Sequence, residues 1–185
     1  EELGIDFLSA SAHKFHGPKG IGFLYASSAD FDSYLHGGDQ EQKKRAGTEN
    51  LAAIVGMVAA LKEDLEQQAE HYQKLEGLKS AFLNEIADLE YYLNESQHQL
   101  PYVINIGFPV QKNDLLLLRL DLEGISISTG SACTAGIVQT SHVLEAFYGP
   151  DSHRLSESVR ISLSPLNTEE ELKQLAQTLK NIIGD

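Results

Sequence analysis

Three residues far apart in the sequence, Lys14, Cys133 and Arg160, have side chains that could take part directly in a reaction. A lysine amine condenses with aldehydes once it has lost its proton, and a cysteine thiolate is a strong nucleophile. An arginine pairs with a carboxylate through two parallel hydrogen bonds. Each of the three side chains could also have an ordinary structural role. The surrounding residues are therefore needed to distinguish a chemical role from a structural one.

Two histidines flank Lys14 in the stretch "SASAHKFHGPKGIGFLY", residues 9–25. Nearby cationic groups or a desolvated loop would favour the neutral, reactive amine. Most lysines are solvated surface cations, however, and by itself this stretch favours that reading. Lys19 lies in a Gly-Pro-Lys-Gly sequence that predicts a turn, and the spacing of a Walker phosphate loop is not present.

Cys133 is the only cysteine of the chain, so it cannot form an internal disulfide. It lies in "STGSACTAG" without a bulky apolar neighbour, and this setting is compatible both with a packed cysteine and with an accessible nucleophile on a loop. Arg160 is the only charged residue in the apolar run "SVRISLS". An arginine in such a run needs an anionic partner, which could be a carboxylate of the protein or of a substrate.

Thr48 is a further candidate, because it follows Gly47 in "KKRAGTEN". It could bind a phosphate through its hydroxyl group and backbone, or it could cap the helix that is predicted to begin near Leu51. The histidines are scattered without metal-ligand spacing, so no metal site built from protein ligands is expected.

Composition limits the class of protein. The 185 residues are 42% hydrophobic, which is enough for a packed core, and the formal net charge is -13. Such a charge opposes binding to nucleic acid or to anionic lipid, and no apolar run is long enough to cross a membrane. With no secretory signal in the first residues, the sequence predicts a cytoplasmic protein. The chain starts without Met, close to an apolar run, which predicts that it begins within a larger protein.

Short apolar runs bounded by Gly and Pro predict buried strands, whereas apolar residues spaced by three and four predict helices. Strands are expected at residues 5–9, 20–26, 101–108, 125–128 and 158–164. One long helix, or two with a bend at Gly77, is expected over about 51–90. The polar stretch 31–50 is expected to form a loop with short helical turns.

Capping signals mark the ends of the remaining helices. Asn113 is a candidate N-cap for a helix that ends near Gly124, and Ser141 is expected to cap a short helix. Thr168 and Glu171 form a capping box before the last helix. That helix is expected to bury Leu172, Leu175, Leu179 and Ile182. Together these elements predict an α/β fold.

Four segments in series resemble the cysteine desulfurases of the NifS and IscS type, which are pyridoxal-phosphate enzymes of fold type I. The segments are "SASAHKFHGPKGIGFLY", "HGGDQEQKKRAGTEN", "STGSACTAG" and "SVRISLSPLNTEEEL". The resemblance implies an aspartate aminotransferase-like fold. Residues 1–60 would be the end of the large cofactor-binding domain, and residues 61–185 the small C-terminal domain.

The resemblance also implies roles around the cofactor. Lys14 corresponds to the lysine that holds pyridoxal phosphate as a Schiff base, and Ser11 and His13 correspond to residues that contact its phosphate. Thr48 matches the threonine that reaches the phosphate in the neighbouring subunit, which implies a homodimer. Lys19 is given no chemical role.

By the same resemblance, Arg160 binds the carboxylate of the substrate L-cysteine, and Cys133 receives its sulfur as a persulfide while L-alanine is formed. The sulfur would pass to an iron-sulfur scaffold protein or to a tRNA-thiolation enzyme. In some relatives the same cysteine shares a nascent iron-sulfur cluster, so Cys133 is also considered as a transient cluster ligand.

The family's upstream half, with residues that complete the cofactor pocket, has no counterpart in this sequence. Two other interpretations therefore stay open. The protein could be a selenocysteine lyase or another fold-type-I lyase, because these would also keep Lys14 and Arg160. Alternatively, this stretch by itself could be an inactive module that provides only dimer or partner contacts.

Overall fold

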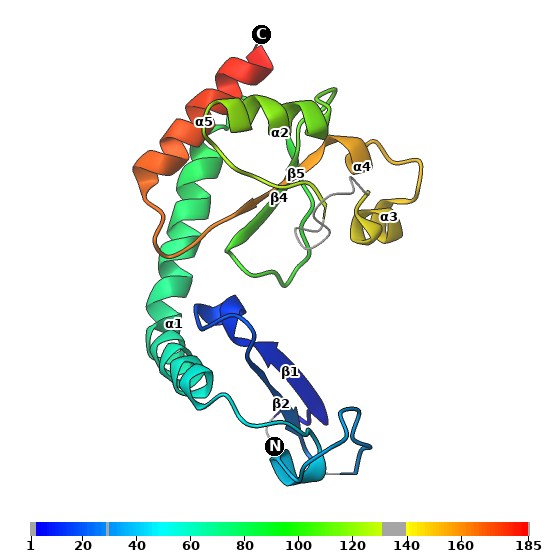
Figure 1. Ribbon diagram of the computed structural model, residues 1–185. Helices are drawn as coiled ribbons and strands as arrows, with labels where there is room; N and C mark the ends of the chain where they lie inside the picture. Colours follow the sequence, from blue (N-terminus) through cyan, green and yellow to red (C-terminus); the bar gives the residue numbers. More distant parts are fainter. Residues whose placement is uncertain (1–2, 29, 131–139, 185) are drawn as a thin grey trace. The chain divides into compact units, whose positions relative to one another are not determined.

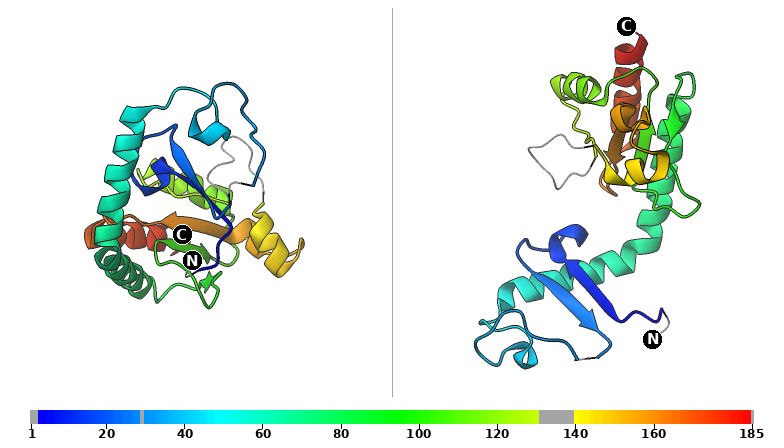
Figure 2. Two further views of the ribbon diagram at one scale, coloured as in Figure 1. Left: turned by 90° about the horizontal axis from the view of Figure 1, so that it is seen from below. Right: turned by 90° about the vertical axis from the view of Figure 1, so that its right-hand side faces the viewer.

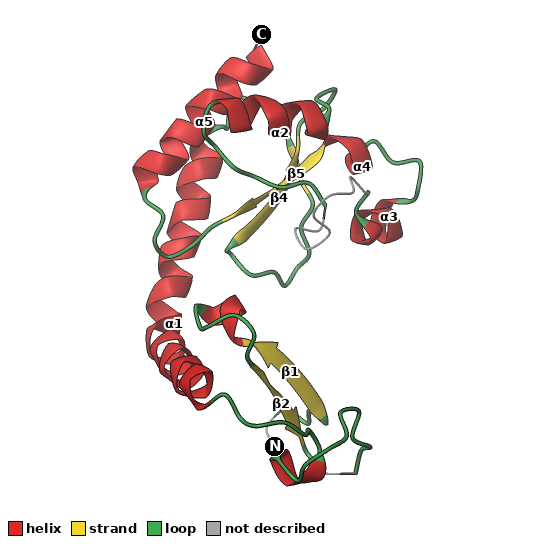
Figure 3. Cartoon of the chain, in the orientation of Figure 1, coloured by secondary structure: helices red, strands yellow, loops and turns green. Residues whose placement is uncertain are grey.

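The computed structural model describes residues 3–28, 30–130 and 140–184 (Figure 1). The chain divides into two compact units, Glu1–Gln68 and Ala69–Asp185. One long helix, α1 (Leu51–Glu85), begins in the first unit and ends in the second. The chain contains both strands and helices in separate sequence segments, as Figure 3 shows.

The first unit is built around a pair of antiparallel strands, β1 (Phe7–Ser11) and β2 (Gly22–Ala26). The short 3-10 helix η1 (Ala12–Phe15) follows β1 directly. A second 3-10 turn, η2 (Glu41–Lys43), lies in the predicted loop of residues 31–50. The two predicted strands and the lysine segment between them are therefore present, but the prediction that these strands are buried is wrong, because most of their residues are exposed.

The second unit contains a three-stranded antiparallel sheet in the order β3-β4-β5. Its strands are β3 (Tyr92–Leu93), β4 (Val103–Gly107) and β5 (Ser158–Ser162). Two longer helices, α2 (Asn113–Leu122) and α5 (Glu169–Gly184), belong to this unit. Two short helices, α3 (His142–Tyr148) and α4 (Arg154–Glu157), precede β5.

One hydrophobic core joins the sheet to the helices of the second unit. Alternate residues of the strands, such as Ile104 and Ile106 in β4 and Val159 and Ile161 in β5, are buried in it. The C-terminal part of α1, together with α2 and α5, lies beside this sheet (Figures 1 and 2). These helices supply most of the other buried side chains. The buried helix residues are Leu75, Leu78, Phe82, Leu116, Leu120, Leu172, Leu175, Ala176, Leu179 and Ile182.

Several predicted helix ends are confirmed. The Ser141 hydroxyl accepts a hydrogen bond from Leu144 N at 3.3 Å at the start of α3. Thr168 and Glu171 form the reciprocal bonds of a capping box, with donor-acceptor distances of 3.2 and 3.0 Å. Gly124 follows the end of α2 with a φ of +75°. All four residues predicted to be buried in the last helix are buried.

Two local predictions are wrong. Asn113 is the first residue of α2, and its side chain donates to the carbonyl groups of Leu155 and Ser158 at 3.3 and 3.1 Å instead of capping its own helix. Residues 125–128 do not form a strand, because only Ser128 pairs with β5. Of the two arrangements expected over about 51–90, the single long helix is confirmed, because α1 continues through Gly77.

Among the helices of the described residues, none is long and apolar enough to cross a membrane. This agrees with the sequence, in which no apolar run has the length that a bilayer requires. The cytoplasmic location stays a prediction.

Replacing Gly107 by alanine should destabilise the second unit. A Cβ atom at this position would lie 2.3 Å from Cζ of Tyr92, the cross-strand neighbour of Gly107 in the β3-β4 pair, so that the ring would have to move. We expect the free energy of unfolding to fall by about 1–3 kcal/mol, as for other overpacked sites. Urea denaturation followed by circular dichroism measures this change.

Gly77→Ala is the matched control, because no described atom lies within 4 Å of the added Cβ. Alanine is the better helix former, so this substitution should raise the free energy of unfolding by about 0.5–1 kcal/mol. Effects of the same sign at the two glycines would contradict the close contact between Gly107 and Tyr92.

Candidate active site

Lys14 lies on η1, in the tight turn that follows β1, and its side chain is exposed. Ala12 fixes the base of this turn, because it is fully buried and its N–H donates to Ile21 O at 3.0 Å. The turn closes where Gly17 N donates to Ala12 O at 2.8 Å. The local backbone therefore buries Ala12 and directs the neighbouring polar residues outward.

Close packing leaves this turn little freedom. A Cβ atom at Gly17 would lie 2.9 Å from Cβ of Ala12, so only glycine fits without a shift. The next residue, Pro18, contacts α1, because a Cβ at Gly56 would be 2.8 Å from its Cγ. The exposed lysine is thus carried on a turn that is itself tightly held, which is the arrangement that a positioned reagent needs.

Ser11 and His13 stand beside Lys14 on the same turn, Ser11 as the last residue of β1 and His13 within η1. Both are exposed. Lys19 lies in the turn before β2, as the Gly-Pro-Lys-Gly sequence predicts. The structure thus brings a primary amine, a hydroxyl group and an imidazole together within four residues of the first unit.

Thr48 is exposed in the loop that leads to α1. The start of the helix is capped by Asn50, whose Oδ1 accepts a hydrogen bond from Ala53 N at 3.1 Å. Thr48 is therefore not needed as the cap. Gly47 N donates to Gln40 Oε1 at 3.1 Å, which ties the segment before Thr48 to an earlier part of the same loop.

Arg160 lies in the middle of β5 and belongs to the second unit. Its neighbours Val159 and Ile161 are buried in the core, so the alternation of a strand places Arg160 on the opposite face. In the β4-β5 register its partner is Asn105, which lies on the same face. The polar face of the sheet therefore carries the predicted carboxylate-binding residue.

The backbone of Arg160 also pairs with Ser128 on the other side of the strand. Arg160 N donates to Ser128 O at 2.6 Å, and Ser128 N donates to Arg160 O at 3.1 Å. The sequence predicted a whole strand over residues 125–128 and did not reveal the single backbone bridge between Ser128 and Arg160. Because of this bridge, the chain that leads to Cys133 departs from a point next to Arg160.

A cleft of about 520 Å³ opens at this face. Residues from β4, β5, α3 and the loop after β3 line it, including Asn105, Arg160, His142, Leu144 and Phe147. The Nε atom of Arg160 is buried, and it has no hydrogen-bond partner among the described residues. A buried donor without an acceptor is costly, and a carboxylate in the cleft would supply the missing acceptor.

Cys133 itself lies outside the described residues, so its predicted role stays a prediction. The described residues on either side of its segment, Gly130 and Thr140, both line the Arg160 cleft. Gly130 lies two residues after Ser128, and Thr140 lies two residues before the start of α3. The two described residues that flank the cysteine segment therefore lie at the cleft that Arg160 lines.

Asn94 organises the polar face beside Arg160. Its Nδ2 donates to Asn105 Oδ1 and to Ser158 Oγ, each at 2.8 Å. Its Oδ1 accepts from Nη1 of Arg154 at 2.6 Å. Sequence reasoning missed these residues, although Asn105 alternates with buried Ile104 and Ile106, which is the pattern of a strand with one polar face.

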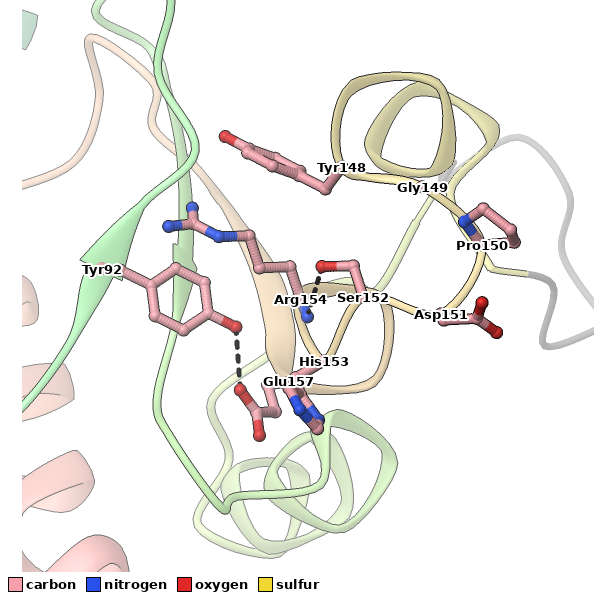
Figure 4. A pocket seen from close by; sticks show the side chains of 9 residues that line it. All are labelled: Tyr92, Tyr148, Gly149, Pro150, Asp151, Ser152, His153, Arg154 and Glu157. Atoms are coloured by element: carbon pink, nitrogen blue, oxygen red, sulfur yellow. Dashed lines mark hydrogen bonds between the residues drawn. The ribbon is translucent and has the colours of Figure 1, made fainter.

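Arg154 lies between two aromatic rings (Figure 4). Its guanidinium carbon is 4.1 Å from the ring centroid of Tyr92 and 4.5 Å from that of Tyr148.

The Tyr92 hydroxyl donates to Glu157 Oε2 at 3.0 Å. Burial, reinforced by the hydrogen bond and the negative charge of Glu157, raises the pKa of Tyr92 to about 12. Tyr92 is therefore a neutral hydrogen-bond donor and not a base.

The predicted site residues fall into two groups. The amine, hydroxyl and imidazole of Lys14, Ser11 and His13 share one turn in the first unit, whereas Arg160 and the two ends of the Cys133 segment share one cleft in the second. Within the described residues, no group of three His, Cys, Asp or Glu side chains could hold a metal ion. The side chains that the sequence predicts to take part in a reaction are thus an amine, a guanidinium group and a thiol.

A strand followed by a lysine-bearing turn, together with a small α/β unit that holds an arginine on its sheet, is the arrangement of the fold-type-I transferases. The chain belongs to the aminotransferase class-V family, which matches residues 1–175. Enzymes of this family use pyridoxal phosphate, and the predicted fold class and cofactor are confirmed at that level.

The relatives are named mainly as desulfurases. A protein from Bacillus subtilis (strain 168) that bears the name IscS 1 is 44% identical over 97% of this chain and 48% of its own length. The cysteine desulfurase IscS of Dictyoglomus turgidum is 40% identical over 99% of this chain and 47% of its own. A solved NifS-like protein superposes with a TM-score of 0.87 at 32% identity, over 100% and 48% of the two chains. The chain thus spans about half the length of the curated relatives it matches.

The residues present fit pyridoxal phosphate. An aldehyde requires a primary amine, which Lys14 provides on an exposed and tightly held turn. A phosphate requires hydrogen-bond donors, which the hydroxyl of Ser11 and the imidazole of His13 provide beside it. The buried Nε of Arg160, which has no hydrogen-bond partner in the described part of the chain, suits the carboxylate of an amino acid.

The raised pKa of Tyr92 makes stability depend on alkaline pH. In the folded protein Tyr92 keeps its proton up to about pH 12, whereas the unfolded chain loses it near pH 10.0. The stabilisation is therefore complete below pH 10 and is lost as the pH rises toward 12. Urea unfolding at a series of pH values should show this decline.

Tyr92→Phe keeps the ring beside Arg154 and removes the titrating hydroxyl. We expect the variant to be less stable than the unmodified chain below pH 10, because the bond to Glu157 is lost. Its stability should fall less steeply between pH 10 and 12. Parallel curves for the two proteins over this range would contradict the assignment.

Proposed function

We propose that this chain is the part of a cysteine desulfurase that carries both the reactive lysine and the reactive cysteine. The protein would remove sulfur from L-cysteine with the help of pyridoxal phosphate, and would release L-alanine. The observation that supports the proposal is that Arg160, whose buried Nε has no hydrogen-bond partner among the described residues, lines the same cleft as Gly130 and Thr140, the described residues that flank the Cys133 segment. The names of the relatives support the same reaction.

In the proposed reaction, the turn after β1 holds the cofactor. Lys14 supplies the amine that binds the aldehyde, while Ser11 and His13 donate hydrogen bonds to the phosphate. When bound, pyridoxal phosphate accepts electron density from the bonds at the substrate α-carbon. The released amine of Lys14 then moves the proton at that carbon.

Arg160 binds the substrate carboxylate and so orients the substrate sulfur toward the Cys133 segment. The thiolate of Cys133 forms a sulfur-sulfur bond with the substrate sulfur as the carbon-sulfur bond breaks. The electron pair of the broken bond stays with the carbon, which takes up a proton and leaves as L-alanine. The persulfide on Cys133 keeps the transferred sulfur, so no external oxidant or reductant is needed.

The persulfide is proposed to pass its sulfur to an acceptor protein, which could be an iron-sulfur scaffold or a tRNA-thiolation enzyme. The IscS names of the relatives favour iron-sulfur assembly. Thr48 is proposed to reach the cofactor phosphate of a second subunit in a homodimer. Its exposed position in a loop, with the helix cap supplied by Asn50, supports this role.

The decisive test uses the whole protein that contains this chain. Cys133→Ala should abolish persulfide labelling with a thiol-reactive probe after incubation with L-cysteine, and should lower L-alanine formation by about 100-fold or more. The visible absorbance of the bound cofactor should be unchanged. Lys14→Ala should lose that absorbance, and borohydride should no longer fix the cofactor to the protein.

The outcomes separate the alternatives. L-Alanine formation at the normal rate in Cys133→Ala would sink the proposal. Release of selenium from selenocysteine at the normal rate in the same variant would favour a selenocysteine lyase. If the chain of 185 residues binds no cofactor whereas the whole protein does, the chain by itself contributes contacts rather than catalysis.

A further inference from the structure

The side chain of Arg154, which is half-buried, makes several contacts within the second unit. Its guanidinium group lies between the rings of Tyr92 and Tyr148, and Nη1 donates to Leu93 O at 3.3 Å and to Asn94 Oδ1 at 2.6 Å. The stacking is visible in Figure 4. A planar cation with donors in its plane satisfies both kinds of contact at once, which a lysine cannot do.

These contacts determine the orientation of two amide groups. A guanidinium group only donates hydrogen bonds, so the oxygen of Asn94 must face Arg154. The nitrogen of Asn94 then faces Asn105 and Ser158, and the atom of Asn105 that accepts its bond is the oxygen Oδ1. The amide nitrogen of Asn105 is thereby directed away from Asn94 as a donor.

Asn105 is the cross-strand partner of Arg160, and both residues line the same cleft. A carboxylate in this cleft would find the donors of Arg160 and the amide nitrogen of Asn105 on one face of the sheet. If the Asn105 amide were reversed, its oxygen would face the carboxylate and repel it. The amide orientation therefore matters for binding.

The second ring of the stack belongs to the wall of the cleft. Tyr148 is the last residue of α3, and five of the seven residues of α3 line the Arg160 cleft. They are His142, Val143, Leu144, Phe147 and Tyr148. Arg154 therefore links the end of this short helix to Tyr92 in the sheet.

We propose that Arg154 is a positioning residue for substrate carboxylate binding, because it sets the amide orientation of Asn94 and Asn105 and holds α3 against the sheet beside Arg160. Arg154 does not itself line the cleft, so it acts through these neighbours. The inference rests on the proposed function for the identity of the substrate. The fixed position of α3 does not depend on that function.

Arg154→Met in the whole, cofactor-loaded protein tests the proposal. Methionine keeps an unbranched apolar side chain similar to the aliphatic part of arginine and removes the donors and the charge. We expect the KM for L-cysteine to rise about tenfold while kcat stays within about twofold, because bound substrate still reacts through Lys14 and Cys133. We also expect faster amide hydrogen exchange in α3.

Arg119→Met is the matched control. Arg119 is another arginine of the second unit, its Nη1 donates to Ile182 O at 2.9 Å, and it does not line the cleft. Its substitution should leave the KM and the exchange of α3 unchanged, even if overall stability falls. Arg154→Lys keeps the charge without the planar fork, so its KM should lie between those of the unmodified protein and Arg154→Met.

An unchanged KM and unchanged α3 exchange in Arg154→Met would overturn the positioning role, as would an equal rise in KM in Arg119→Met. If Arg154→Met does not fold, the same two measurements on Arg154→Lys decide, and values equal to those of the unmodified protein overturn it. Absence of desulfurase activity in the unmodified protein would contradict the proposed function alone, because α3 exchange still reports on Arg154.

Discussion

The architecture of the second unit depends on the strand alternation of β5. Its backbone pairs with β4 along one edge and with Ser128 on the other, and Val159 and Ile161 are locked into the core. A slip of one residue would place Arg160 in that core and would expose both aliphatic side chains. Burial of an unpaired guanidinium is far more costly than any contact it could gain there, so core packing dictates the face on which Arg160 lies.

The first unit positions its reagent by a different physical means. No large core surrounds Lys14; instead, the buried methyl group of Ala12 and the tight approach of Gly17 fix a short turn whose polar residues face outward. A site of this kind depends on local backbone geometry, whereas the Arg160 cleft depends on pairing between distant strands. The two halves of the proposed chemistry are consequently sensitive to different substitutions.

This difference explains what the sequence could predict. Local signals such as the Ser141 cap, the Thr168 capping box and the lysine turn involve neighbouring residues and were confirmed. The contacts that were missed join distant segments: Asn94 bonds to Ser158, and Asn113 donates to carbonyl groups more than 40 residues away. No periodicity in a single segment reveals such partners. The roles of Lys14, Cys133 and Arg160 followed from resemblance, because their surroundings alone left ordinary interpretations open.

The proposed site also has to attract a carboxylate in a chain with a formal net charge of -13. Long-range attraction is unfavourable for an anionic group, so recognition has to come from donors that act at contact distance. The buried Nε of Arg160, from which no described residue accepts a hydrogen bond, and the Asn105 amide held in one orientation are such donors, because they need no rearrangement when the ligand arrives. The guanidinium group of Arg154 already contacts Asn94 and the two rings around it. Among the described residues, Arg160 is the arginine that lines the cleft, together with Asn105. Selectivity for a carboxylate thus follows from the fixed positions of a few hydrogen-bond donors, and not from the net charge of the chain.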